Sequence, residues 1–172
     1  MSISTLTARV VAPAERLLAA AAFLPPLATR VTIGLGFFHT GLGKWHNFER
    51  TVEFFASVGI PFACANAAFI ATLEVVGGLL LLVGLLTRLS AALLAGSMTV
   101  ALLTADRQSF IASWGSASES SPTDIASFVF LLFLLWLIVH GAGAVSLDRL
   151  VGLAFGRAAG RAGMAPVAAV GR

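Results

Sequence analysis

Four long apolar runs constrain what this chain can fold into more than any other feature of its sequence. A helix needs about 20 mostly apolar residues to cross the hydrocarbon core of a bilayer. The runs cover residues 27–46, 63–87, 89–105 and 125–144. They are continuous and lack the alternation of apolar and polar residues that is typical of barrel strands. The pattern therefore predicts four membrane-spanning helices and argues against a β-barrel.

The composition excludes a soluble globular protein. Hydrophobic residues make up 58% of the chain and charged residues 11%, with a mean hydropathy of +0.95. Soluble domains carry about 25% charged residues, and a soluble fold of 172 residues could not bury this much apolar surface. Disordered chains are polar and charge-rich, so disorder of the whole chain is excluded too. We predict an all-α membrane protein, a four-transmembrane-helix bundle that contacts membrane lipid.

Several classes of partner and reaction lack support in the sequence. The formal net charge is +3, but the basic residues stand at the ends of apolar runs, so we expect no nucleic-acid partner. The single cysteine, Cys64, excludes an internal disulfide and a cysteine zinc site. No ligand spacing typical of a metal site is present, and we expect no metal. Motifs for nucleotide hydrolysis and for serine or zinc proteolysis are also absent from the sequence.

The two ends of the chain differ from the runs between them. We predict that residues 1–25 form an interfacial segment that Pro25-Pro26 separates from the first span. A cleaved signal peptide is the alternative, because Arg16 precedes a short apolar stretch. Residues 26–150 form the predicted membrane domain. Residues 151–172, rich in Gly, Ala and Arg, are predicted to be a disordered basic tail.

The distribution of basic residues predicts the orientation of the spans. Lys and Arg accumulate on the cytoplasmic side of membrane proteins. With four spans, both termini and the loop between the second and third runs share one side. That side carries Arg9, Arg16, Arg30, Arg88, Arg149, Arg157, Arg161 and Arg172, whereas the other carries Lys44, Arg50 and Arg107. We therefore predict that both termini are cytoplasmic.

Polar residues inside the apolar runs are the candidates for function. A charged side chain at the centre of a membrane helix costs about 2.5–3.5 kcal/mol on insertion scales, so such residues usually face the bundle interior and find partners. Glu74 falls near the midplane of the second span. At a rise of about 1.5 Å per residue, His39 lies about 13 Å beyond Arg30, near the depth of Glu74, and Lys44 about 21 Å beyond it. His140 falls near the level of Arg30.

These five residues suggest a site that handles protons. Glu74 and His39 are the candidate catalytic residues, because a carboxyl and an imidazole beside one apolar cavity can exchange protons with a quinone or another redox carrier. Arg30, Lys44 and His140 are candidates for binding such a carrier. The alternative is a structural network of hydrogen bonds and ion pairs between the helices, in which Arg30 and Lys44 extend to the membrane interfaces.

Several short motifs stand in a fixed order around the four runs. They are Arg30, Gly34, Gly41 and Lys44, then Gly59-Ile60-Pro61, Glu74 with Gly77-Gly78-Leu79-Leu80, Gly84-Leu85-Leu86-Thr87-Arg88, Gly141-Ala142-Gly143, and Ser146-Leu147-Asp148. Their order and spacing over about residues 26–150 resemble the DoxX-like family of small four-helix bacterial membrane proteins. Where the family pattern often has a His at the end of the third span, this chain has Asp106-Arg107.

The resemblance implies a multi-pass protein of the bacterial inner membrane that associates with oxidoreductase systems. The name-giving members resemble a subunit of a thiosulfate:quinone oxidoreductase. By the same resemblance, Glu74 matches the intramembrane acid of the family, and Arg30 and Lys44 match its basic positions in the first span.

Together these arguments predict an integral membrane subunit of an oxidoreductase system. It would couple a soluble or membrane redox partner to the quinone pool, alone or as a homo-oligomer. A non-catalytic membrane anchor or assembly protein is the alternative. A small transporter is a third class, although the short chain lacks the repeated halves and paired helix breaks of transporters.

Overall fold

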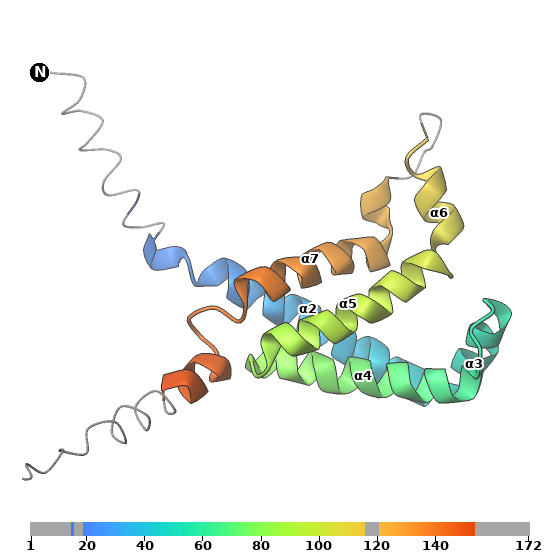
Figure 1. Cartoon of the computed structure of the whole chain (residues 1–172), viewed down its shortest axis with the longest axis horizontal. Helices are drawn as coiled ribbons and strands as arrows, with labels where there is room; N and C mark the ends of the chain where they lie inside the picture. The colour runs from blue at the N-terminus through green and yellow to red at the C-terminus, as the bar shows by residue number, and fades with distance from the viewer. Residues whose placement is uncertain (1–14, 16–18, 116–120, 154–172) are drawn as a thin grey trace, which may run out of the picture.

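All regular structure in the part of the chain that the computed structural model describes, residues 15, 19–115 and 121–153, is helical. The helices that match the four apolar runs are α2 (Leu24–His46), α4 (Ala63–Val83), α5 (Thr87–Leu103) and α7 (Ala126–His140). Figure 1 shows them running alongside one another. The closest pairs are α2 with α4 and α5 with α7, and α4 also packs on α5. The all-α prediction is confirmed for these residues.

Helix length separates these elements into two groups. Two segments, Ala19–His46 and Ala63–Val83, are long and apolar enough to cross a membrane. Helices α5 and α7 are apolar but shorter, with 17 and 15 residues. The fourth run was expected to stay helical to residue 144, but α7 ends at His140 because Gly141 adopts a φ of 74°. By length and composition alone, the described residues contain two candidate spans rather than four.

Two of the segments between the four apolar runs contain short helices. Helix α3 (Phe48–Ser57) lies between α2 and α4, and α6 (Arg107–Ala112) follows α5. A 3₁₀ turn, η1 (Pro122–Asp124), precedes α7. Helix α3 forms because one of its faces is apolar, which buries Phe55 against the bundle. Figure 1 shows α3 and α6 at the same end of the molecule.

The prolines near the start of α2 do not separate it from the residues before it as expected. The turn falls at Ala22 and Phe23, and Pro25 and Pro26 lie in the first turn of α2. Proline is tolerated there because the first amides of a helix have no partner within the helix. Of the predicted interfacial segment, residues 1–14 and 16–18 lie outside the described residues, as does 154–172 of the predicted tail.

A glycine turn joins α4 to α5. Gly84 has a φ of 69°, which favours glycine because a Cβ strains this conformation. The amide of Leu85 donates to the Leu80 carbonyl at 2.9 Å, and that of Gly84 donates to Leu81 at 3.2 Å. These two bonds form a Schellman motif, which ends α4 and satisfies its last carbonyls. The turn lies against Arg30 of α2, and α5 begins directly after it.

Close backbone contact holds α2 against α4. A Cβ at Gly34 would lie 2.9 Å from the Gly78 carbonyl oxygen, and a Cβ at Gly78 would lie 2.7 Å from that of Gly34. A Cβ at Gly41 would lie 2.7 Å from the Val75 nitrogen. Small residues that let backbones approach are the usual means of packing membrane helices. These glycines therefore pack α2 against α4.

Polar contacts identify which helix ends lie together. Arg30 in α2 donates to Ala142 after α7, at what we call the Arg30 end of the bundle. At the other, which we call the Lys44 end, the Ser127 hydroxyl donates to the Asp106 carboxylate at 2.5 Å. Between them lies a core of Ile33, Phe37, Leu81, Ala91, Leu94, Ala95, Leu134 and Leu137. The cavity beside Glu74 lies on the Lys44 side of this core.

Candidate functional site

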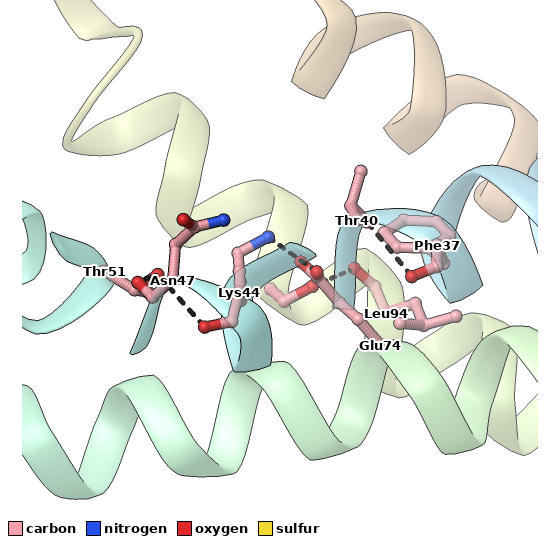
Figure 2. Close-up of polar contacts among 8 residues, drawn as sticks. Phe37, Thr40, Lys44, Asn47, Thr51, Glu74 and Leu94 are labelled. Atoms are coloured by element: carbon pink, nitrogen blue, oxygen red, sulfur yellow. Dashed lines mark hydrogen bonds and ion pairs between the residues drawn. The ribbon is translucent and has the colours of Figure 1, made fainter. Parts of the chain in front are cut away.

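A buried ion pair joins α2 to α4. The Lys44 ammonium lies 2.6 Å from Oε2 of Glu74 (Figure 2). Glu74 is 2% exposed, and Lys44 is 27% exposed. Lys44 stands in the last turn of α2, so its long side chain reaches back along the helix to the carboxylate in the middle of α4. The sequence placed these residues at different depths, and the length of the lysine side chain closes that gap.

The corner between α2 and α3 fixes the backbone that carries Lys44. The Asn47 side-chain amide donates to the Gly43 carbonyl at 3.1 Å. The Thr51 hydroxyl lies 3.0 Å from the Asn47 carbonyl and 3.4 Å from that of Lys44 (Figure 2). These bonds satisfy carbonyls at the end of α2, which has no further helical turn to use them. These hydrogen bonds therefore fix the backbone at Lys44.

A cavity of about 620 Å³ opens beside the ion pair. Side chains from α3, α4 and α5 form most of its wall, and the wall is largely apolar. Its polar members are Lys44, Glu74, Asn66, Ser97, Thr104 and Asp106. Gly96 also lines it, and a Cβ there would meet nothing within 4 Å. An apolar cavity with a few convergent polar groups is the usual form of a small-molecule site.

The other buried charge, Arg30, serves a different purpose. Its side chain is 3% exposed. Nη1 donates to the Ala142 carbonyl at 2.8 Å, and Nη2 donates to Val145 at 2.7 Å. Gly84 leaves the space the guanidinium occupies, because a Cβ there would collide with it. Arg30 therefore fastens the segment after α7 to the first helix, at a distance from the cavity.

Asp148 caps the start of α5, far from it in the sequence. Its carboxylate accepts from the amides of Leu86 at 2.7 Å and Thr87 at 3.0 Å, at the start of α5. Its own amide donates to the Gly84 carbonyl at 2.8 Å. The helix that begins at residue 147 uses Ser146 instead, whose hydroxyl accepts from the Arg149 amide at 3.3 Å. A carboxylate at the positive end of α5 is favourable.

His39 is not part of the interior group predicted for it. It is exposed on the outer side of α2, where its ring meets Phe38 edge-on at 5.9 Å. The helical period explains the difference, because two residues correspond to about 200° of rotation. The buried positions Phe37 and Gly41 flank His39 at that spacing and face inward. The structure brings Lys44, rather than His39, to Glu74.

His140 also lies outside the interior group. It is exposed at the end of α7, and its ring stacks on Trp136 at 4.6 Å. Its Nδ1 lies 3.0 Å from the Trp136 carbonyl oxygen. It is near the Arg30 end, as predicted from depth, but it lines a different cavity from Glu74.

Sequence reasoning missed three polar members of the cavity wall, Asn66, Ser97 and Thr104, of which Thr104 donates to the Val100 carbonyl at 2.7 Å. Asn66 donates to the Pro61 carbonyl at 2.7 Å, and Ser97 donates to Leu94 at 2.8 Å. Their positions inside apolar runs were the available signal. Asp106 was noted only as a departure from a family pattern, and its bond to Ser127 ties α5 to α7.

The arrangement supports proton and hydrogen-bond chemistry. The Glu74 carboxylate can accept and release a proton, and the Lys44 ammonium can donate to an oxygen atom in the cavity. Among the described residues, no three His, Cys, Asp or Glu side chains cluster as ligands for a metal ion. The geometry favours an organic ligand that is mostly apolar and carries hydrogen-bond acceptors.

Comparisons with known proteins agree with the resemblance. The family model described as DoxX matches residues 26–107. Over 78 residues the chain is 40% identical to "Putative oxidoreductase CatD" of Bacillus subtilis. The aligned region covers 45% of this chain and 57% of that protein. Over 136 residues it is 32% identical to "Uncharacterized membrane protein Rv3486" of Mycobacterium tuberculosis, covering 73% of this chain and 81% of that protein. No solved structure matches.

Proposed function

The chain belongs to the DoxX family of membrane proteins, and from that premise we propose that it is a quinone-linked subunit of an oxidoreductase system. The observation that carries the proposal is the Lys44–Glu74 pair on the wall of an apolar cavity. The relative that bears the name "Putative oxidoreductase CatD" supports the redox class.

A quinone fits the chemistry of this cavity. Its ring carries two carbonyl oxygens, and its isoprenoid chain is apolar. In this proposal Lys44 Nζ donates a hydrogen bond to one carbonyl oxygen. Glu74 holds a proton at its carboxylate and delivers it to the reduced carrier. Reduction to the quinol takes two electrons and two protons. A partner of the dehydrogenase class supplies the electrons, and Glu74 delivers both protons in turn, taking up the second from water after releasing the first.

The proposal includes four crossings of the bacterial inner membrane with both termini cytoplasmic. At about 1.5 Å per residue, α5 and α7 span about 26 Å and 23 Å, against a hydrocarbon core of about 30 Å. Local thinning of the bilayer accommodates a shortfall of this size. Reporter fusions after Arg172 and in the segment near Ser118 test it. A C-terminal reporter active outside the cytoplasm would overturn the orientation.

The first experiment identifies what accompanies the protein. The full chain is purified from native membranes in mild detergent, and mass spectrometry identifies every small molecule and protein that co-purifies. We expect a stoichiometric quinone together with a dehydrogenase-type partner. Lipid alone would favour the anchor or transport alternatives.

Two glycine substitutions test whether the cavity is the binding site. Gly96→Leu fills the cavity, whereas Gly43→Leu adds the same side chain to an exposed position that also has nothing within 4 Å of its Cβ. We expect Gly96→Leu to reduce binding of a short-chain benzoquinone at least tenfold, with Gly43→Leu unchanged. Equal binding by both variants would contradict the site.

Glu74→Gln tests the proton role. Gln keeps the shape of the side chain and can still accept a hydrogen bond from Lys44, but it cannot hold the transferable proton. We expect quinone-linked activity in membranes to fall by 10²-fold or more, in the range for loss of a general acid or base. The protein level and melting temperature measure folding in the same variant. Full activity would refute proton handling, and a loss of folding alone would favour the structural alternative.

A further inference from the structure

Two adjoining cavities lie at the Arg30 end, away from the proposed quinone site. The first, about 650 Å³, lies between the start of α5 and the end of α7. The second, about 460 Å³, lies along the helical residues 147–153. Ala144, Ser146 and Arg149 line both. Arg149 thus stands at the boundary between them.

The first cavity is basic. Arg88, His140 and Arg149 line it and are exposed. Nη2 of Arg88 donates to the Val139 carbonyl at 3.2 Å, which fixes the side chain. The other N–H groups of the guanidinium can still donate to a ligand. Asp148 also lines the cavity, but each of its carboxylate oxygens accepts a backbone amide of the α4–α5 turn. The groups left to meet a ligand are therefore mainly cationic.

The second cavity is apolar over most of its wall. Its lining includes Val83, Val145, Leu147 and Leu150, of which the latter three are 53%, 40% and 62% exposed. Arg30 also lines it, and its buried Nε has no hydrogen-bond partner among the described residues. A hydrated ion gains nothing from such a surface, but a hydrocarbon chain does.

We propose that these two cavities together bind one anionic phospholipid. The phosphate lies on Arg88 and Arg149, and one acyl chain occupies the apolar cavity. Guanidinium groups bind phosphate through charge-assisted, often bidentate hydrogen bonds. The adjoining apolar cavity selects a lipid over free phosphate. The inference goes beyond the proposed redox function, and it requires only that this end faces a leaflet that contains anionic lipid.

Lipid titration of the purified full chain tests the proposal. Melting temperature and native mass spectrometry are followed in detergent with dioleoyl phosphatidylglycerol, dioleoyl phosphatidylcholine, dihexanoyl phosphatidylglycerol or inorganic phosphate. We expect the dioleoyl phosphatidylglycerol to bind and stabilise most. Loss of two charge-assisted contacts in Arg88→Gln/Arg149→Gln should weaken its binding about tenfold or more.

Matched variants separate this site from general charge. Arg50→Gln/Arg107→Gln removes two exposed cations at the Lys44 end and should leave lipid binding unchanged. Leu150→Gln should weaken binding of the dioleoyl lipid and leave the dihexanoyl lipid unaffected. Arg88→Lys keeps the charge and should bind the dioleoyl phosphatidylglycerol with intermediate affinity. This variant tests the site if the double variant does not fold.

Three outcomes would overturn the proposal. Equal stabilisation by phosphatidylcholine would remove the charge requirement. Equal stabilisation by inorganic phosphate would make the ligand a free anion. Undiminished phosphatidylglycerol binding by folded Arg88→Gln/Arg149→Gln would place the lipid elsewhere.

Discussion

The two ends of the bundle each bury a charge, but they treat it differently. At the Arg30 end the guanidinium donates to two backbone carbonyls, Ala142 and Val145, and is packed against Gly84. At the Lys44 end the Glu74 carboxylate meets another side chain, and a cavity opens beside the pair. The first charge bonds to groups that cannot titrate or move away. The second, Glu74, bonds to the Lys44 ammonium, a flexible group that could instead bond to a ligand in the cavity.

Under the proposed function, this difference separates a structural charge from a functional one. A buried group whose donors are used by the backbone stabilises a connection between segments. A buried group held by one flexible side chain beside a cavity is available for chemistry. We therefore expect substitutions at the Arg30 end to reduce stability and those at the Lys44 end to reduce activity.

Gly84→Ala should have the largest effect on stability. The added Cβ collides with the Arg30 guanidinium and takes a positive φ of 69°. We expect a loss of about 2–5 kcal/mol of unfolding free energy, combining overpacking with backbone strain. Reversible unfolding in detergent measures it. Gly43→Ala, where the Cβ meets nothing within 4 Å, is the control and should stay near the parent.

Arg30→Gln should come next. It removes two charge-assisted bonds and leaves the Ala142 and Val145 carbonyls without their donors, which costs about 3 kcal/mol. Limited proteolysis should show faster cleavage within residues 141–153 than in the parent. Arg30→Lys should recover part of the loss. A variant with parental stability and cleavage would mean that Arg30 does not fasten this segment.

Asp148→Asn should have a smaller effect at the same end. Asn retains one carbonyl oxygen and loses the charge, so one of the two amides at Leu86 and Thr87 loses its acceptor. We expect the free energy of unfolding to fall by about 1 kcal/mol, as for a lost helix cap. Hydrogen exchange at the start of α5 measures it. Faster exchange at α7 with α5 unchanged would contradict the assignment.

Lys44→Met/Glu74→Leu should change stability least. Replacing a buried ion pair with apolar residues of similar volume is often neutral or stabilising. We expect a melting temperature within a few degrees of the parent and complete loss of quinone-linked activity. A large loss of stability would show that the pair is structural, and the contrast between the two ends would then disappear.

The sequence predicted the helices well and the site in part. Continuous apolar runs were enough to predict the helices α2, α4, α5 and α7. Depth along a helix placed Glu74 level with His39 and placed Lys44 beyond them. Depth alone cannot give direction around the axis, so His39 was wrongly placed inside. The cap of Asp148 on α5 joins residues 61 and 62 positions apart, and no local pattern encodes it. The cavity exists because of how three helices meet, which single runs do not reveal.

The tight contact between α2 and α4 has a consequence for biogenesis. Gly34 and Gly78 leave no room for lipid between the two backbones. Glu74 entering a bilayer without Lys44 would expose its charge to hydrocarbon, at a cost of a few kcal/mol. The two helices are therefore expected to enter as a hairpin, with α3 remaining as the link at the Lys44 end. We therefore expect α2 to insert stably only after α4 has also been synthesised.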